Sequence, residues 1–221
     1  MRIVYLSSSN IPSRSANSIH VMKMCQAFAR RGHEVVLIAP GRKETERGVV
    51  DVFSFYGVED CFQIVHLPWL RVKGEHYLDG YLAAKKAKLL QADLVYGRSL
   101  VGCFFAGAMG MPVVFESHAP ADNRGVIPNW MFRRLISART FQRLVVITHA
   151  LKDYYLDRYP SLSGKVQVAP DGADPCSDST ELAELPNLDA NLRVGYVGHL
   201  YPGRGIEIIE YLAGTCPWAD F

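Results

Sequence analysis

Two polar residues follow predicted buried strands, where a side chain can act on a ligand. His118 comes after Glu116 and Ser117, at the end of an apolar run. Open α/β sheets bind ligands at the carboxyl ends of their strands, and an imidazole there can donate to a hydroxyl or a carbonyl, or act on a proton. Arg98 follows Gly97 after another such run and is interpreted in the same way. The alternative for both is an ordinary loop side chain with a local hydrogen bond.

A glycine-rich turn from Gly198 to Gly205 is the second candidate. It leaves a predicted strand, contains Gly203 and Arg204, and leads into a predicted helix. Glycines permit close backbone approach, arginine adds a positive charge, and a helix N-terminus adds N–H donors. This combination suits a diphosphate. The alternative is a tight strand-to-helix connection without a ligand.

The first loop, residues 7–18, carries no G-x-G-x-x-G pattern, which disfavours a dinucleotide site of that kind. The loop ends at a predicted helix N-terminus, where Asn17 or Ser18 can serve as N-cap. We favour capping over ligand binding at this position. His20 lies near the start of the same helix, and a solvent-facing position is its alternative.

The elements that position these residues alternate along the chain. The predicted strands are Ile3–Ser7, Glu34–Ala39, Gln63–Leu67, Asp93–Tyr96, Pro112–Glu116, Leu144–Ile147, Lys165–Ala169 and Leu192–Val197. The predicted helices are Asn17–Arg31, Tyr77–Gln91, Leu100–Met109, Ile127–Gln142, Ala150–Tyr159 and Ile206–Ala213. The strands are continuously apolar, so both faces of the sheet should be covered. We therefore expect an α/β fold with a doubly wound, Rossmann-like parallel sheet.

The predicted organisation is a first domain, a linker and part of a second domain. Residues 1–174 form the Rossmann-like domain, and residues 175–191, rich in Pro, Ser, Asp and Asn, form the linker. Residues 192–221 then supply only one strand and one helix. Such a unit cannot bury a core of its own, so we expect a fragment or a truncated product of a longer protein.

Composition excludes several classes of protein. The 221 residues are 49% hydrophobic and 21% charged, which is typical of a globular chain. A net charge of +2 is too small to indicate nucleic acid as the main partner. Five widely spaced cysteines disfavour a disulfide framework. Because the N-terminal apolar run is also too short for a signal peptide, we expect a soluble, reduced, cytoplasmic protein.

A basic and aromatic segment allows a further interpretation. Trp130 and Phe132 lie close to Arg133 and Arg134 in the predicted helix Ile127–Gln142. Such a helix can rest on an anionic membrane surface, here the inner face of a membrane. We favour the alternative, a helix packed on the sheet with a solvated basic face.

Short motifs spread over the whole chain resemble those of family 4 glycosyltransferases, in the same order. The motifs are Ser18-Ile19-His20-Val21, Gly32-His33-Glu34-Val35, Asp93-Leu94-Val95-Tyr96, the run from Pro112 to His118, Val146-Ile147-Thr148, Pro170-Asp171-Gly172-Ala173-Asp174, and Val197-Gly198-His199 with Pro202-Gly203-Arg204-Gly205. Each motif is weak alone, but their order makes the set fairly specific.

The resemblance implies the N-terminal half of a GT-B fold, in which a sugar passes from a nucleotide-sugar to a glycan, lipid-linked or small-molecule acceptor. Transfer in this family usually retains configuration and needs no metal or bound cofactor. His118 would be the catalytic residue that contacts the donor sugar, and Arg204 would neutralise the leaving diphosphate. The implied donor-binding residues are Gly198, His199, Arg204 and Gly205, and the acceptor-side residues are Asn17, Ser18, His20 and Arg98.

The chain departs from the family pattern at three places. Ala16-Asn17 stands where the family often has a glycine pair, and His199 where it usually has arginine. The family's later pair of glutamates would lie beyond Phe221, so we expect most of the nucleotide pocket to be missing and this chain alone to be inactive. The alternative function is a non-catalytic Rossmann-like binding or scaffold module. A nucleotide-sugar epimerase is the weakest interpretation.

Overall fold

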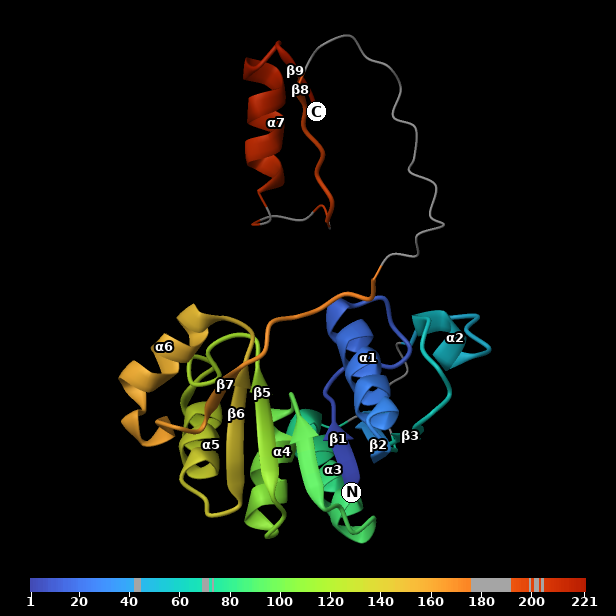
Figure 1. The fold of residues 1–221 in the computed structure, drawn as a ribbon, viewed down its shortest axis with the longest axis vertical. Helices are drawn as coiled ribbons and strands as arrows, with labels where there is room; N and C mark the ends of the chain where they lie inside the picture. Colours follow the sequence, from blue (N-terminus) through green and yellow to red (C-terminus); the bar gives the residue numbers. More distant parts are fainter. Residues whose placement is uncertain are drawn as a thin grey trace. The chain divides into compact units, whose positions relative to one another are not determined.

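The computed structural model describes residues 1–41, 45–68, 72, 74–175, 192–198, 200, 203 and 205–221 (Figure 1). The chain divides into two compact units, residues 1–172 and residues 173–221. The predicted linker lies outside the described residues except for Pro175.

A seven-stranded sheet forms the centre of the first unit (Figure 1). All of its neighbouring strands pair in parallel. In sheet order the strands are β3 (Gln63–His66), β2 (Glu34–Ala39), β1 (Arg2–Leu6), β4 (Leu94–Gly97), β5 (Val113–Ser117), β6 (Phe141–Val146) and β7 (Val166–Val168). From β1 to β3 the chain adds strands toward one edge of the sheet, and from β4 to β7 it adds them toward the other edge. Such a switch point, here between β1 and β4, opens a crevice at the carboxyl ends of the strands.

Helices cover both faces of this sheet, as predicted. They are α1 (Ala16–Arg30), α2 (Val52–Tyr56), α3 (Glu75–Leu89), α4 (Leu100–Ala108), α5 (Val126–Ile136) and α6 (His149–Arg158), followed by a 3-10 turn (Pro160–Leu162). α1 and α2 share one core with the side chains of β1 and β2 that include Tyr5 and Leu37. α3, α4, α5 and α6 share the other core with residues such as Leu6 and Phe115. The predicted doubly wound, Rossmann-like sheet is therefore confirmed.

The predicted helix Ile127–Gln142 is wrong over its last turn and a half. α5 ends at Ile136, and Phe141 already begins β6 opposite Val113. Thr140 fixes this turn, because its hydroxyl donates to the carbonyl of Gly107 and its own carbonyl accepts from Val113. Leu135, Ile136 and Phe141 are buried in one core. Their spacing fits one long helix as well as a helix that is followed by a turn and a strand, so the spacing alone could not decide between the two.

Two smaller differences concern the start of α1 and the short helix α2. α1 begins at Ala16, and its N-cap is Ser15 rather than Asn17 or Ser18, since the Ser15 hydroxyl accepts from the backbone N–H of Ser18. α2 was not predicted, because five residues are too few to show helical periodicity. Its N-cap is Asp51, whose carboxylate accepts from the N–H of Phe53.

The second unit is small and open. β8 (Leu192–Arg193) pairs in parallel with β9 (Ala219–Asp220), and α7 (Ile206–Thr215) connects them. The predicted strand Leu192–Val197 is thus much shorter, and β9 was not predicted. None of the ten residues of α7, all of them described, is buried, as expected of a strand and helix without a full sheet.

Among the described residues, no helix has both the length and the apolar character that crossing a bilayer requires. The four cysteines in this part of the chain, Cys25, Cys61, Cys103 and Cys216, are free thiols.

Candidate functional site

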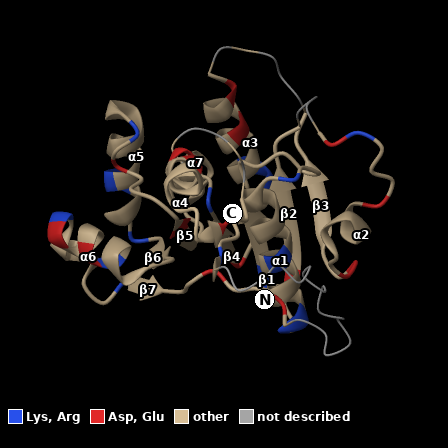
Figure 2. Cartoon of the chain, turned by 90° about the horizontal axis from the view of Figure 1, so that it is seen from above, with Lys and Arg blue, Asp and Glu red and all other residues tan. Residues whose placement is uncertain are grey.

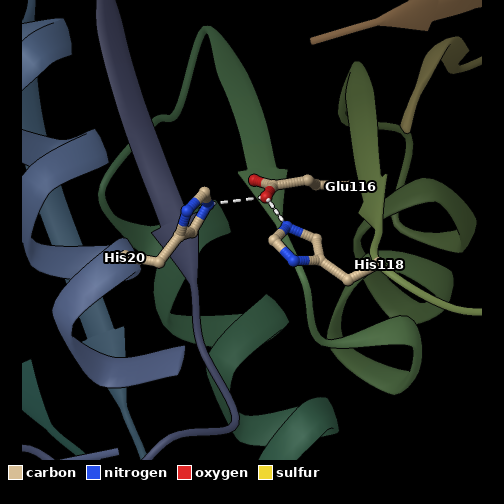
Figure 3. A group of neighbouring side chains, drawn as sticks. All are labelled: His20, Glu116 and His118. Atoms are coloured by element: carbon tan, nitrogen blue, oxygen red, sulfur yellow. Dashed lines mark hydrogen bonds and ion pairs between the residues drawn. The ribbon is translucent and has the colours of Figure 1, made fainter. Parts of the chain in front are cut away.

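The candidate site lies at the carboxyl end of β5. Phe115 and Val113 of this strand pack in the core beneath α4 and α5. Side chains alternate along a strand, so Glu116 projects to the opposite face, toward α1. His118 follows two residues later and meets Glu116 there, while His20 reaches the same point from α1 (Figure 3).

Glu116 binds both imidazoles through one oxygen. Nε2 of His118 lies 2.5 Å from Oε1 of Glu116, within hydrogen-bond geometry. Nε2 of His20 lies 2.6 Å from the same oxygen, a charge contact without good hydrogen-bond geometry. The two rings meet edge to face, with centroids 4.8 Å apart. The predicted solvent-facing alternative for His20 is therefore wrong, because its side chain is only 18% exposed.

The carboxyl group of Glu116 is ionised in spite of its burial. Its side chain is 2% exposed, and burial by itself raises the pKa of a carboxyl group. The contacts from His118 and His20 outweigh that effect and hold the pKa of Glu116 well below its usual range. Tyr5 donates to Oε2 at 3.3 Å, and burial raises the pKa of this phenol, so it remains a donor. Glu116 is thus a fixed negative charge behind two imidazoles.

Asp171 completes the group on the solvent side. Its Oδ1 lies 3.3 Å from Nδ1 of His20, and its Oδ2 lies 3.7 Å from Nδ1 of His118. The Asp171 side chain is 53% exposed. Each imidazole therefore stands between two carboxylates, a buried one at Nε2 and an exposed one at Nδ1. Such a pair of acceptors orients an imidazole ring and decides which nitrogen carries a proton.

The remaining predicted acceptor-side residues, Arg98, Ser18 and Asn17, have three different environments. Arg98 follows β4 and is half-buried, and its positive charge acts on the phenol of Tyr96, whose pKa is nonetheless raised by burial. Ser18 is fully buried, and its hydroxyl donates to the carbonyls of Ser13 and Ser15. That hydroxyl stabilises the first loop. Asn17 carries a buried Oδ1 with no hydrogen-bond partner among the described residues.

The predicted donor-binding turn belongs to the second unit. Gly205 is the N-cap of α7 with φ +83°, and Gly203 has φ +84°. Both occupy the left-handed region, which glycine adopts without strain. Gly198 is the first residue of the turn, and His199 and Arg204 lie outside the described residues. The proposed diphosphate role of this turn stays a prediction.

Two members of the site, Glu116 and Asp171, were not among the predicted site residues. The spacing of Glu116 and His118 contained a signal, since residues two apart on a strand share a face. Asp171 belongs to a motif that supported only the family resemblance, and it lies far from the other three residues in the chain. Only the folding of the loop after β7 brings it to them.

Comparison with known proteins gives a family match and several similar folds. A family model for Glycosyltransferase Family 4 matches residues 18–176. The catalytic domain of starch synthase IV from Arabidopsis thaliana, bound to ADP and acarbose, has a TM-score of 0.62 at 11% identity, over 96% of this chain and 65% of that one. The lipopolysaccharide outer core galactosyltransferase WaaB has a TM-score of 0.58 at 11% identity, over 100% of this chain and 59% of that one.

A UDP-GlcNAc 2-epimerase from Methanocaldococcus jannaschii has a TM-score of 0.55 at 14% identity, over 76% of this chain and 45% of that one. At these identities the likeness concerns the fold alone. The chain spans roughly half to two thirds of the length of these three proteins. No curated protein matches the sequence significantly.

Proposed function

Because the chain belongs to Glycosyltransferase Family 4 and folds as the N-terminal, Rossmann-like half of a GT-B enzyme, we propose that it transfers a sugar from a nucleotide-sugar donor to an acceptor hydroxyl. The observation that carries this proposal is the group of His20, Glu116 and His118 at the carboxyl end of β5. Transfer would retain configuration at the sugar, and a hexose is the sugar we expect.

His118 is the residue that we assign to the donor sugar. Glu116 is ionised and accepts a hydrogen bond from Nε2 of His118, so this nitrogen carries a proton and the ring cannot turn freely. Nδ1 of His118 and Oδ2 of Asp171 are 3.7 Å apart, too far for a direct hydrogen bond. A sugar hydroxyl near both atoms would donate its proton to one of them, Nδ1 or Oδ2, since each is an acceptor when Nε2 carries the proton of the ring. Buried polar groups that match a substrate hydroxyl in this way discriminate strongly against analogues without it.

The donor diphosphate is assigned to the turn that contains Gly198, His199, Arg204 and Gly205. Negative charge grows on the leaving phosphate during transfer, and a fixed cation stabilises that charge selectively. Arg204 is the cation that we propose for this role. The starch synthase that shares this fold holds ADP and acarbose, which supports a nucleotide and a saccharide as ligands here.

A small hollow at the switch point of the sheet, about 30 Å³ in volume, is proposed to take one polar group of the acceptor. Ser7 and Ser8 after β1, and Ser99 after β4, line it together with His76 and Asp79 of α3. Hydroxyl, imidazole and carboxylate groups suit a ligand with several hydroxyls, such as a glycan or the sugar of a lipid-linked or small-molecule acceptor. Asn17, Ser18, His20 and Arg98 stay on the acceptor side in this proposal, with Ser18 acting through the loop that it stabilises.

A second proposal is peripheral contact with the inner face of a membrane, for a protein of the cytoplasm. In α5, Val126, Ile127 and Trp130 are exposed. The charged residues of this helix, Arg133 and Arg134, are both basic, whereas α6 carries both signs (Figure 2). The rest of the aromatic and apolar face packs in the core, including Phe132. Exposed apolar groups beside arginines suit an anionic lipid surface.

The test measures sugar binding and transfer separately. Saturation-transfer NMR with a panel of nucleotide sugars would detect even weak donor binding to residues 1–221. In the full-length gene product, His118→Ala should lower turnover tenfold or more, since one charged polar contact contributes roughly 1.5–3 kcal/mol. His149→Ala, at an exposed histidine of α6, is the matched control. Wild-type turnover by folded His118→Ala protein would remove this residue from the site, and a gene product that never transfers sugar would favour a scaffold.

A further inference from the structure

An apolar groove lies between α4 and α5, outside the candidate site. Most of the residues that line it are apolar or small, and one is basic: Phe104, Gly107 and Ala108 of α4, and Trp130, Arg134 and Leu135 of α5. Its volume is about 300 Å³, which is enough for a small apolar ligand. Because Gly107 and Ala108 have little or no side chain, the space between the larger groups stays open.

The larger side chains give the groove an apolar interior and a charged edge. Leu135 is buried and lies at the bottom of the groove. The rings of Phe104 and Trp130 have their centroids 5.3 Å apart. The guanidinium group of Arg134 lies 5.9 Å from the centre of the Trp130 ring, and this arginine is exposed. A bound ligand would therefore meet hydrocarbon inside the groove and a cation where it leaves.

The exposed side of α5 continues the apolar surface beyond the groove. Val126 and Ile127 precede Trp130 by four and three residues, so they lie on the same side of the helix. All three side chains are more than half exposed. Arg134 follows Trp130 by four residues and lies on this side as well. Apolar groups thus lead to an arginine along the helix, as a hydrocarbon chain leads to an anionic headgroup in a lipid.

The exposed charges around the groove have one sign. Between residues 94 and 143 the acidic residues are Glu116 and Asp122, and both are buried. The exposed charged residues of this stretch, some of them visible on α5 in Figure 2, are all arginines: Arg124, Arg133, Arg134, Arg139 and Arg143. The whole chain has a net charge of only +2, so positive charge is concentrated here. Such a surface attracts an anionic partner, whereas a second copy docked through it would bring like charges together.

We propose that the groove between α4 and α5 binds one acyl chain of an anionic phospholipid, whose phosphate group meets Arg134. The stem of this arginine can lie along the apolar surface while its guanidinium reaches the headgroup. Trp130, an amphipathic ring at the rim, suits the boundary between hydrocarbon and water. The inference rests on the membrane contact proposed above and adds a defined lipid site to it. Adsorption to a membrane by itself requires exposed apolar and basic groups but no groove.

The first experiment measures binding to vesicles of phosphatidylcholine and phosphatidylglycerol, with brominated acyl chains that quench tryptophan fluorescence. The background carries Trp69→Phe and Trp218→Phe, so that Trp130 alone reports. Ala108→Leu fills the groove and should weaken binding about tenfold, the effect of extra methylene groups in an apolar pocket. Plain adsorption would instead gain from the added apolar surface. Ala27→Leu makes the same change at an exposed position of α1 and should bind as the wild type does.

The charged edge of the groove is tested in the same assay. Arg134→Ala should weaken binding to these vesicles about fivefold, the effect of one basic residue near an anionic surface. Arg31→Ala, at an exposed arginine that follows α1, is the control and should have little effect. Vesicles of phosphatidylcholine alone should bind the wild type only weakly. Equal binding to both kinds of vesicle would contradict the role of Arg134.

A soluble lipid separates the groove from adsorption to a bilayer. Dioctanoyl phosphatidylglycerol, kept below its critical micelle concentration, should bind one molecule per chain in the wild type and in Ala27→Leu, and about tenfold more weakly in Ala108→Leu. Circular dichroism checks that each variant is folded, and Ala138→Leu, at another lining residue, replaces Ala108→Leu if that variant is not.

The proposal is overturned if the folded groove variant binds the soluble lipid as the wild type does, or if the wild type binds none. A dimer that Ala108→Leu dissociates would also overturn it, because a second copy would then fill the groove. If the soluble lipid fails while the vesicles still bind, the membrane contact stands without the groove. If the wild type binds no vesicles, both fail. The transferase proposal is independent of each of these results.

Discussion

Tyr155 of α6 holds the loop that follows His118. Removing its hydroxyl changes the support of this loop without altering His118 itself. The side chain is fully buried. Its oxygen accepts from the backbone N–H of Ala121 at 2.8 Å and lies 2.7 Å from Oγ of Ser117. Ser117 donates its own proton to the carbonyl of Ala119, so Tyr155 is the donor in the contact with Ser117. A Tyr155→Phe variant removes these two bonds and the longer one, 3.3 Å, that the hydroxyl donates to the carbonyl of Ala119, and it keeps the ring.

The expected cost follows from what remains unpaired. The N–H of Ala121, a residue 2% exposed, loses its acceptor, and a buried unsatisfied group costs about 1–3 kcal/mol. The lost bond to Ser117 adds about 0.5–1.5 kcal/mol, while Ser117 keeps its bond to Ala119. We therefore expect Tyr155→Phe to lower the free energy of unfolding by about 1.5–4.5 kcal/mol.

The neighbouring Tyr154 provides a matched control. Its hydroxyl donates to Oδ1 of Asp122 at 3.0 Å, but the side chain is partly exposed and Asp122 keeps the hydroxyl of Tyr159. Asp122 is buried but keeps Tyr159 and Arg158 as partners, so Tyr154→Phe should cost about 0.5–1.5 kcal/mol, the net contribution of one hydrogen bond. The two variants make the same chemical change on the same helix. Urea unfolding followed by circular dichroism measures both costs.

Amide hydrogen exchange supplies the local readout. In the wild type the N–H of Ala121 should be protected, and in Tyr155→Phe a peptide covering residues 118–122 should exchange faster, since opening of this loop no longer breaks a bond. Tyr154→Phe should leave that peptide unchanged. Equal costs for the two variants, within about 0.5 kcal/mol, together with unchanged exchange at Ala121, would refute the reasoning that Tyr155 fixes the loop after His118.

Two other predictions concern the sheet and the surface. Gly97→Ala should lower the free energy of unfolding by about 1–3 kcal/mol or more, because a Cβ there would lie 2.4 Å from the carbonyl oxygen of Leu6. In the control Gly172→Ala a Cβ would meet nothing within 4 Å, so this variant should lose little stability. Equal urea midpoints for the two variants would contradict this prediction. Trp130→Ser should reduce cosedimentation with anionic vesicles several-fold, since Trp130 is 51% exposed beside basic residues; undiminished sedimentation would exclude this surface as the contact.

Much of the fold could be predicted because its signals are local. β1 and β2 are apolar almost throughout and buried on both faces, which is what helices on both sides of a sheet require. The end of α5 could not be predicted in the same way. Its turn depends on a hydroxyl of Thr140 that meets the carbonyl of Gly107, a contact between residues of different elements.

The site could be predicted only in part, for a related reason. His118 was identified from its place after a buried strand, and His20 from a motif at the start of a helix. Ser18 shows the limit of such motifs, because its hydroxyl is occupied within the first loop. A polar residue near a helix start looks the same in sequence whether it faces a ligand or the loop before it.

By itself the sequence determined the alternation of strands and helices, the covered sheet and the family, since apolar periodicity and short motifs act over a few residues. Only the tertiary structure decided that His20, Glu116, His118 and Asp171 form one group. The strand order brings the end of β5 within reach of α1, and the loop after β7 returns to the same edge. These contacts join residues as far apart as His20 and Asp171. They follow from the packing of whole elements, which no local pattern encodes.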